Sequence, residues 1–246
     1  MRWLILFVLT ILNFAAAAAT ESVARARQLI VVSAPSWESE MGELEMLSKT
    51  DGGKWVRHGR EVAVVLGHGL AWGRGLHAQP KSGPMKREGD RRAPAGIFAI
   101  GPAFGYAAKP PAGCRLPYHP ITEQDYFVDD PDAKEYNRWV RLPPDADPNQ
   151  RWRSAEKMRR TDFLYQLGIV IHHNMDPVMK GQGSAIFFHV WRNSSTPTVG
   201  CTAMDRSDMM TLLKWIDPKK RPLLIQAPTA ELPALRAQIN SRDGQN

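Results

Sequence analysis

The chain has 246 residues, 43% of them hydrophobic, so it can bury the core of one sizeable domain or of two small ones at most. Its formal net charge is +7 without a dense block of Lys and Arg, which suits an acidic surface such as a cell-wall polymer or anionic lipid. With only Cys114 and Cys201, it is not a disulfide-stapled small domain, although these two cysteines could form one disulfide.

Residues 1–19 have the pattern of a secretory signal peptide. Arg2 precedes the apolar run "WLILFVLTILNF", and an alanine tract ending at Ala19 supplies the small residues that a signal peptidase accepts. The apolar run is shorter than the roughly 20 residues of a spanning helix, so we predict cleavage rather than a membrane anchor. The mature protein is then expected to be exported, without stable membrane insertion, and nucleic acid is not expected as a partner.

The first half of the mature chain reads as strands separated by turns. Strands are predicted at residues 29–33, 61–67 and 96–101, because these runs are rich in β-branched and apolar residues. Residues 42–59 are predicted to form a hairpin, since Asp51-Gly52-Gly53 supplies positive-φ turn chemistry. A long polar loop rich in Gly and Pro is expected over residues 69–95.

The middle of the chain, about residues 102–160, is rich in Pro, Asp and aromatic residues and lacks helical periodicity. We interpret it as a long, loop-rich insertion, and a loop of this length in a compact domain is often functional. A helical turn with Ser154 as its cap is expected at "SAEKM".

The last third contains the strands and the helix that flank Cys201. Strands are predicted at residues 168–174, 184–191 and 221–228, and an amphipathic helix at 205–218, with Ser207 as its cap and Pro218 as its stop. The tail, residues 228–246, can begin with a short helix. The predicted fold class is mainly β, a sandwich or partly closed barrel with a late α-helix and a loop-rich insertion.

"HVWRNSSTPTVGCTAM" is the stretch most suggestive of chemistry. His189 ends a strand on which Phe187 and His189 face one side and Ile186 and Phe188 the other, so a rigid element aims the imidazole. Gly200 lets the backbone turn closely before Cys201, and the helix predicted after the cysteine would lower the pKa of the thiol. The spacing alone leaves open that Cys201 is a small buried residue in a turn.

Several further segments give the sequence a specific resemblance. "GSAIFFHVW" and "TPTVGCTAM", together with "KREGDRRAPAGIFAIG", "SAEKM" and "IVIHHN", occur in an order that resembles the L,D-transpeptidases of the YkuD-domain family, in particular the gram-negative branch with a long insertion. The resemblance covers nearly the whole mature chain, and it implies a catalytic domain over residues 28–227. It also implies a periplasmic location.

The resemblance implies a role for individual residues. Cys201 would be the nucleophile, and His189 would be the proton acceptor and donor. The Gly200 turn and the Cys201 amide would form the oxyanion hole. Members of this family commonly orient the histidine through a backbone carbonyl. Substrate-binding roles are predicted for Thr198, Ser184, Arg192 and His173. Two departures are Ala93, in place of a threonine, and "CTAM", where many members carry a basic residue after the cysteine.

The expected reaction is peptidoglycan cross-linking without a cofactor or a metal. Cys201 would attack the carbonyl of the third residue of a donor peptide stem, and an amine would resolve the thioester. One alternative is a thiol amidase or L,D-carboxypeptidase that uses water as the acceptor. Another alternative is a non-catalytic wall-binding module, but this function would not require a Cys, a His and a Gly turn to be arranged together. The sequence does not identify the acyl acceptor.

Other candidate residues are weaker. Neighbouring His172 and His173 face opposite sides of a strand and are unsuited to bind one metal, so His173 either lines the cleft or is a core histidine. His68 and His77 lack the ligand set of a zinc site. Three further residues were considered: Arg91 and Arg92 as carboxylate contacts, and Glu156 as a residue near the cleft by resemblance.

Overall fold

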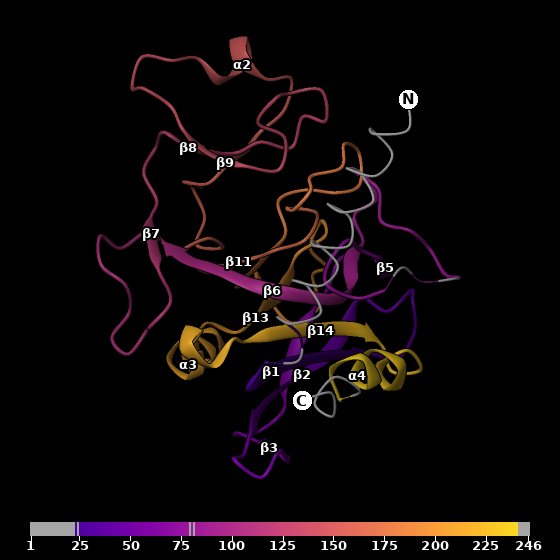
Figure 1. Cartoon of the computed structure of the whole chain (residues 1–246). Coiled ribbons are helices and arrows are strands. Elements are labelled where there is room, and N and C mark those ends of the chain that lie inside the picture. Colours follow the sequence, from indigo (N-terminus) through magenta and orange to yellow (C-terminus); the bar gives the residue numbers. More distant parts are fainter. Residues whose placement is uncertain (1–22, 24, 79, 81, 241–246) are drawn as a thin grey trace, which may run out of the picture.

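Eight strands close into a ring in the structure, a computed structural model that describes residues 23, 25–78, 80 and 82–240. Around the ring, in which β2 pairs again with β1, the order is β1 (Gln28–Ala34), β14 (Leu223–Pro228), β6 (Ala93–Gly105), β11 (Leu167–Ile171), β12 (Phe187–Val190), β13 (Thr202–Met204), β4 (Val62–Val65) and β2 (Met41–Lys49). The predicted mainly β, barrel-like fold is confirmed (Figure 1). The predicted signal peptide, residues 1–19, lies outside the described residues.

Three short strands extend the sheet beyond the ring. β3 (Trp55–Arg57) pairs with the end of β2 across the predicted hairpin, in which Gly53 adopts a φ of 80°. β5 (Leu70–Trp72) and β7 (Tyr118–Pro120) run parallel to the two halves of β6. The loop predicted over residues 69–95 is therefore interrupted by β5, whose carbonyl at Leu70 accepts a hydrogen bond from the Arg92 guanidinium at 2.9 Å.

Strand β6 is longer than the predicted residues 96–101. Pro102 lacks the N–H that a regular strand needs, which favours an end at Gly101. The pairing shifts register here, because Ile171 lies opposite Ile100 whereas Ile169 lies opposite Ala103. This irregularity accommodates the proline and lets the strand continue to Gly105.

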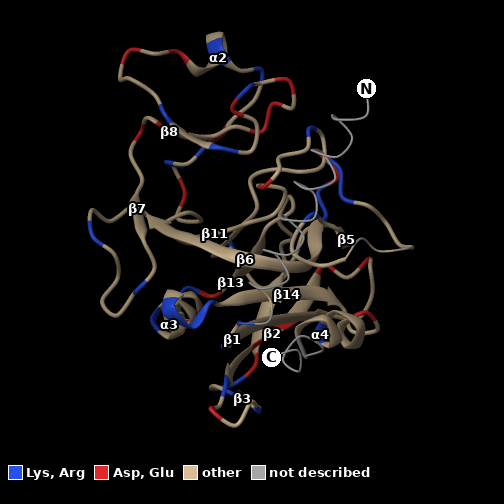
Figure 2. Cartoon of the chain, in the orientation of Figure 1, with Lys and Arg blue, Asp and Glu red and all other residues tan. Residues whose placement is uncertain are grey.

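The insertion folds as a small unit beside the barrel. A second sheet has the order β10 (Glu156–Lys157), β8 (Asp125–Phe127), β9 (Trp139–Arg141). Helix α2 (Pro148–Arg151) lies between β9 and β10 in the chain and stands at the top of the view in Figure 1. The helical turn predicted at "SAEKM" is wrong: Glu156 pairs with Phe127 across the sheet, and Ser154 precedes this strand and caps no helix. Figure 2 shows acidic and basic residues interspersed along this unit.

The late helix forms where predicted, but its N-cap differs and it ends at Trp215, so Pro218 is not its stop. Helix α3 (Arg206–Trp215) has Asp205 as its N-cap, and the Asp205 carboxylate accepts a hydrogen bond from the Ser207 N–H at 2.7 Å. Ser207 is therefore not the cap, because the carboxylate of Asp205, two residues earlier, accepts from the Ser207 N–H. A short 3-10 helix, η1 (Pro218–Lys220), follows, and helix α4 (Leu232–Asn240) packs beside β14 (Figure 1). No helix among the described residues has the length and apolar character needed to cross a membrane.

Two hydrophobic clusters meet at the strands that flank Cys201. The larger cluster fills the barrel and includes Ile186 and Phe188 from β12 and its approach. The smaller one lies between the outer face of the barrel and the insertion, and it consists of Phe104, Ile121, Phe127, Met158, Tyr165, Val170, Phe187 and Cys201. The fold therefore places Cys201 at the boundary between the barrel and the insertion.

Candidate active site

Cys201 and His189 are held by two neighbouring parallel strands. His189 lies in β12 opposite Ala203 of β13, and Cys201 comes immediately before β13. Because side chains alternate along a strand, Cys201 and Ala203 share one face. Ordinary strand spacing puts the Cα atoms of Cys201 and His189 about 8 Å apart on this diagonal. Their side chains can therefore approach each other on the outer face of the barrel.

The alternation predicted for β12 is confirmed. The Phe187 and His189 rings both pack edge-on against Tyr165, with ring centroids 5.7 and 5.3 Å away. Ile186 and Phe188 belong instead to the barrel core. A strand with one face in the core and the other against Tyr165 has little freedom to rotate, so the position of the imidazole is fixed.

A backbone carbonyl, not a carboxylate, orients His189. Its Nδ1–H donates to the carbonyl oxygen of Val190 at 2.8 Å, which leaves Nε2 as the acceptor in the neutral ring. Burial lowers the pKa of His189 to about 4. The imidazole is therefore neutral over most of the pH range and can accept a proton at Nε2.

The Cys201 thiol is buried and protonated. Its Sγ donates to the Ala185 carbonyl at 3.5 Å, and burial raises the pKa of the thiol to about 12. The expected lowering of this pKa by a helix N-terminus is wrong. Strand β13 separates Cys201 from α3, so the positive end of that helix lies at the far end of the strand.

A hydrogen-bonded turn delivers Cys201 to the strand. The Thr198 hydroxyl donates to the Cys201 carbonyl at 2.6 Å and accepts from the Gly200 N–H at 3.1 Å. Gly200 has a φ of 135°, which side chains rarely allow, and a Cβ there would lie 3.3 Å from the Arg92 carbonyl oxygen. Thr198 and Gly200 therefore shape the backbone on either side of the thiol.

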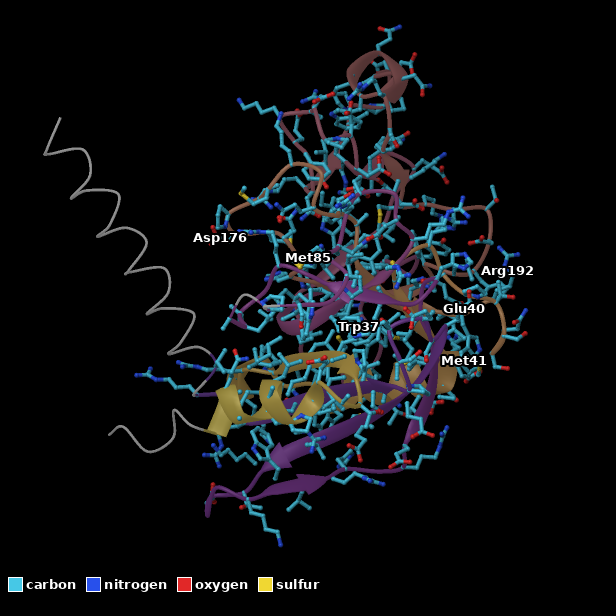
Figure 3. The ribbon with its side chains drawn as sticks, turned by 90° about the vertical axis from the view of Figure 1, so that its right-hand side faces the viewer. Trp37, Glu40, Met41, Met85, Asp176 and Arg192 are labelled. Atoms are coloured by element: carbon cyan, nitrogen blue, oxygen red, sulfur yellow. The ribbon has the colours of Figure 1, made fainter. Side chains whose placement is uncertain are left out.

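A cavity of about 270 Å³ adjoins His189. Its wall includes His189, Tyr165, Thr198 and two basic residues, Arg160 and Arg192. In Figure 3, Arg192 and Asp176 lie on opposite sides of the molecule. Of the residues predicted to bind substrate, Thr198 and Arg192 thus reach the wall of the cavity beside the imidazole.

Sequence reasoning missed Arg160 and Tyr165. The Arg160 guanidinium donates to Glu156 at 2.8 Å and to both oxygens of Asp162 at 2.9 and 3.0 Å. The Arg160 guanidinium also lies over the Tyr165 ring, 5.1 Å from its centroid. The contacts around Arg160 join the insertion to the barrel, so they leave no local pattern in the sequence from which Arg160 and Tyr165 could be predicted.

Ser184 and His173 occupy structural positions. The Ser184 hydroxyl donates to Glu88 at 2.7 Å. His173 is 1% exposed, with Nδ1 accepting from the Arg74 N–H at 3.2 Å and Nε2 donating to the Gln182 carbonyl at 3.0 Å. Both nitrogens of His173 are occupied, so His173 is the core histidine, one of the two alternatives given for it above. His172 is exposed and faces the other way, as predicted.

The Arg92 backbone lies beside the Gly200 turn, but its side chain is not part of the cavity wall. The Arg92 guanidinium binds the backbone carbonyls of Trp37 and Leu70, so it is committed to the fold. Cys114 packs against the barrel core and Cys201 against the smaller cluster, and both thiols are free. Within the described residues, no group of three or more His, Cys, Asp or Glu residues could hold a metal ion.

A thiol beside a neutral imidazole, on a rigid strand pair, has the composition of a site for nucleophilic acyl transfer. The family model of the L,D-transpeptidase catalytic domain, YkuD, matches residues 44–225. The chain therefore belongs to this family, whose activity is directed at peptidoglycan outside the cytoplasm. Searches of the curated proteins and of the solved structures found no match.

Proposed function

We propose that the protein is a peptidoglycan L,D-transpeptidase with Cys201 as its nucleophile and His189 as its proton acceptor and donor. The observation that carries the proposal is that His189 of β12 and Cys201, which directly precedes β13, share one face of the barrel. The hydrogen bond from Nδ1 to Val190 leaves the Nε2 of His189 as an acceptor. Residues 1–19 would direct the chain to the periplasm of a gram-negative envelope.

The reaction begins when the Cys201 sulfur attacks the carbonyl carbon of the third residue of a donor stem. Because the thiol is protonated at rest, its proton passes to Nε2 of His189 as the C–S bond forms. The tetrahedral intermediate then collapses, the peptide bond breaks, and the departing amine of the terminal D-amino acid takes the proton from His189. The product is a thioester on Cys201.

An amine from a second stem completes the cycle. Its nitrogen attacks the thioester carbonyl, its proton passes to His189, and the C–S bond breaks as the proton returns to the sulfur. The apolar surroundings of Cys201, from Phe187, Met158 and Phe127, disfavour water as the acceptor. This supports cross-linking over hydrolysis.

The turn before Cys201 would stabilise the negative oxygen of the intermediate. The Gly200 N–H is occupied by the Thr198 hydroxyl, so we assign Gly200 the role of shaping the turn. The Cys201 amide is left as the oxyanion donor of this turn. Thr198 contributes by fixing the Cys201 carbonyl, and thereby the plane of the peptide that follows it.

Mass spectrometry of muropeptides tests the proposal. Wild-type protein incubated with tetrapeptide stems should release the terminal residue and produce cross-linked dimers, whereas Cys201→Ala and His189→Ala should produce neither. Cys114→Ala is the matched control and should retain activity. Unchanged cross-linking by Cys201→Ala contradicts the proposal, and shortened stems without dimers, even with added amine, indicate a carboxypeptidase instead.

A further inference from the structure

The cavity beside His189 has a one-sided charge. Its wall contains two arginines, Arg160 and Arg192, and no acidic residue among the described residues that line it. The carboxylates that pair with these arginines, Glu156 and Asp162, are not among the residues that line the cavity. A ligand that enters the cavity therefore meets positive groups, which favours an anion.

Arg160 is held rigidly in the wall. Nε and Nη2 donate to the two oxygens of Asp162, and Nη1 donates to Glu156. Its guanidinium also lies over the Tyr165 ring, 5.1 Å from the centroid. These bonds use three of the five N–H groups of the guanidinium. Within the part of the chain that the structure describes, the other two N–H groups are left to donate to a ligand.

Arg192 is the more exposed of the two. Its side chain is 58% exposed, and its contact with Asp162 is a single ion pair at 3.5 Å. A long, weakly held arginine can swing over a bound carboxylate and complete a contact that a fixed partner begins. The pair thus combines one preorganised guanidinium with one that closes on the ligand.

We infer that Arg160 and Arg192 bind the terminal carboxylate of the donor stem, in the D-amino acid that Cys201 chemistry expels. The inference rests on the proposed function. His189 must hand a proton to the amine of that residue, so the residue must lie against the imidazole and hence in this cavity. Its carboxylate is separated from the amine by one Cα, within about 4 Å by covalent geometry. It therefore falls beside the arginines.

This assignment accounts for a departure in the sequence. "CTAM" carries no basic residue after Cys201. The cationic side chains come instead from Arg160, in the segment before β11, and from Arg192, in the segment after β12.

The test compares two donors that differ only at the terminus, a tetrapeptide with a free carboxylate and the same tetrapeptide as its carboxamide. The measured quantity is the rate at which Cys201 becomes acylated, followed by the mass of the intact protein. Wild-type protein should favour the carboxylate by about 10- to 100-fold, the usual effect of hydrogen bonds to a charged group. Arg160→Gln should remove most of this preference by slowing only the carboxylate donor.

Three further variants sharpen the comparison. Arg160→Lys should restore part of the preference, because it returns the charge without the fork of donors. Arg192→Gln should give a smaller loss, and this exposed side chain keeps the test valid even where Arg160→Gln fails to fold. Arg159→Gln is the matched control, because Arg159 lies over Tyr106, 4.2 Å from its ring centroid, and is not part of the cavity wall.

Two results would overturn the inference while leaving the proposed function intact. One is a wild-type protein that acylates equally fast with carboxylate and carboxamide. The other is an equal slowing of both donors by Arg192→Gln and by folded Arg160→Gln, as expected of a purely structural role. Absence of any acylation in wild-type protein is a different failure, because it contradicts the proposed function together with the inference.

Discussion

Cys201 lies one residue before the strand that pairs with the strand of His189, and the two side chains share the outer face of the barrel. Both groups are neutral at rest, since burial raises the pKa of Cys201 to about 12 and lowers that of His189 to about 4. The site is therefore not a preformed thiolate–imidazolium pair. Proton transfer has to accompany the attack, which restricts nucleophilicity to the moment when a substrate carbonyl is in place.

The pH dependence of acylation should reflect the lowered pKa of His189. The neutral imidazole is the active form, and it persists as the pH falls below its ordinary value of 6.5 until the pH approaches about 4. We expect kcat/KM to be nearly flat between pH 8 and pH 5 and to fall tenfold per pH unit below about 4. Acylation assays stopped at set times measure kcat/KM at each pH. Circular dichroism at the same pH establishes that the protein is folded. An acid limb centred near pH 6.5 would contradict the neutral buried imidazole.

Replacing Thr198 should loosen the turn that holds the nucleophile. Thr198→Val removes a donor to the Cys201 carbonyl and an acceptor for the Gly200 N–H. At about 1 kcal/mol per hydrogen bond, the free energy of unfolding should fall by about 2 kcal/mol, and acylation should slow. Thr198→Ser keeps the hydroxyl and should remain close to wild type in urea unfolding and in acylation. Equal behaviour of the Val and Ser variants argues against this role of the hydroxyl.

Gly200 should not tolerate a side chain. Gly200→Ala places a Cβ at a φ of 135° and 3.3 Å from the Arg92 carbonyl oxygen, so the turn must shift. We expect a loss of about 1–3 kcal/mol in the free energy of unfolding and slower acylation. Gly52→Ala is the control, since Gly52 has no positive φ and its Cβ would make only an ordinary contact with Thr50 Oγ1 at 3.9 Å. If both alanine variants unfold at the same urea concentration as wild type, the turn is not constrained as described.

Periodicity and turn chemistry predict much of the barrel. The alternation along residues 184–191 places His189 on the outer face, and Asp51-Gly52-Gly53 marks the hairpin between β2 and β3. Both are local signals, because a strand has a period of two and a tight turn needs particular residues. The proposed nucleophile and its proposed base therefore both lie in a single short stretch of sequence.

The parts that sequence reasoning could not predict depend on pairing between distant segments. Strand β13 has three residues, too few to show a pattern, and it is this strand that separates Cys201 from helix α3. Residues 156–157 form a strand only because β8 lies beside them, and that pairing helps to bring Arg160 to the cavity. Tertiary contacts override local helical propensity there, so the cationic wall appears only in the folded chain.

The account depends most directly on covalent acylation of Cys201. Intact-protein mass spectrometry after brief mixing with a tetrapeptide donor should show an added mass equal to the stem without its terminal residue, and peptide mapping should place it on Cys201. The adduct should be absent from Cys201→Ala and present in Cys114→Ala. No adduct on wild-type protein while dimers still form, or an adduct that persists in Cys201→Ala, would contradict the central claim.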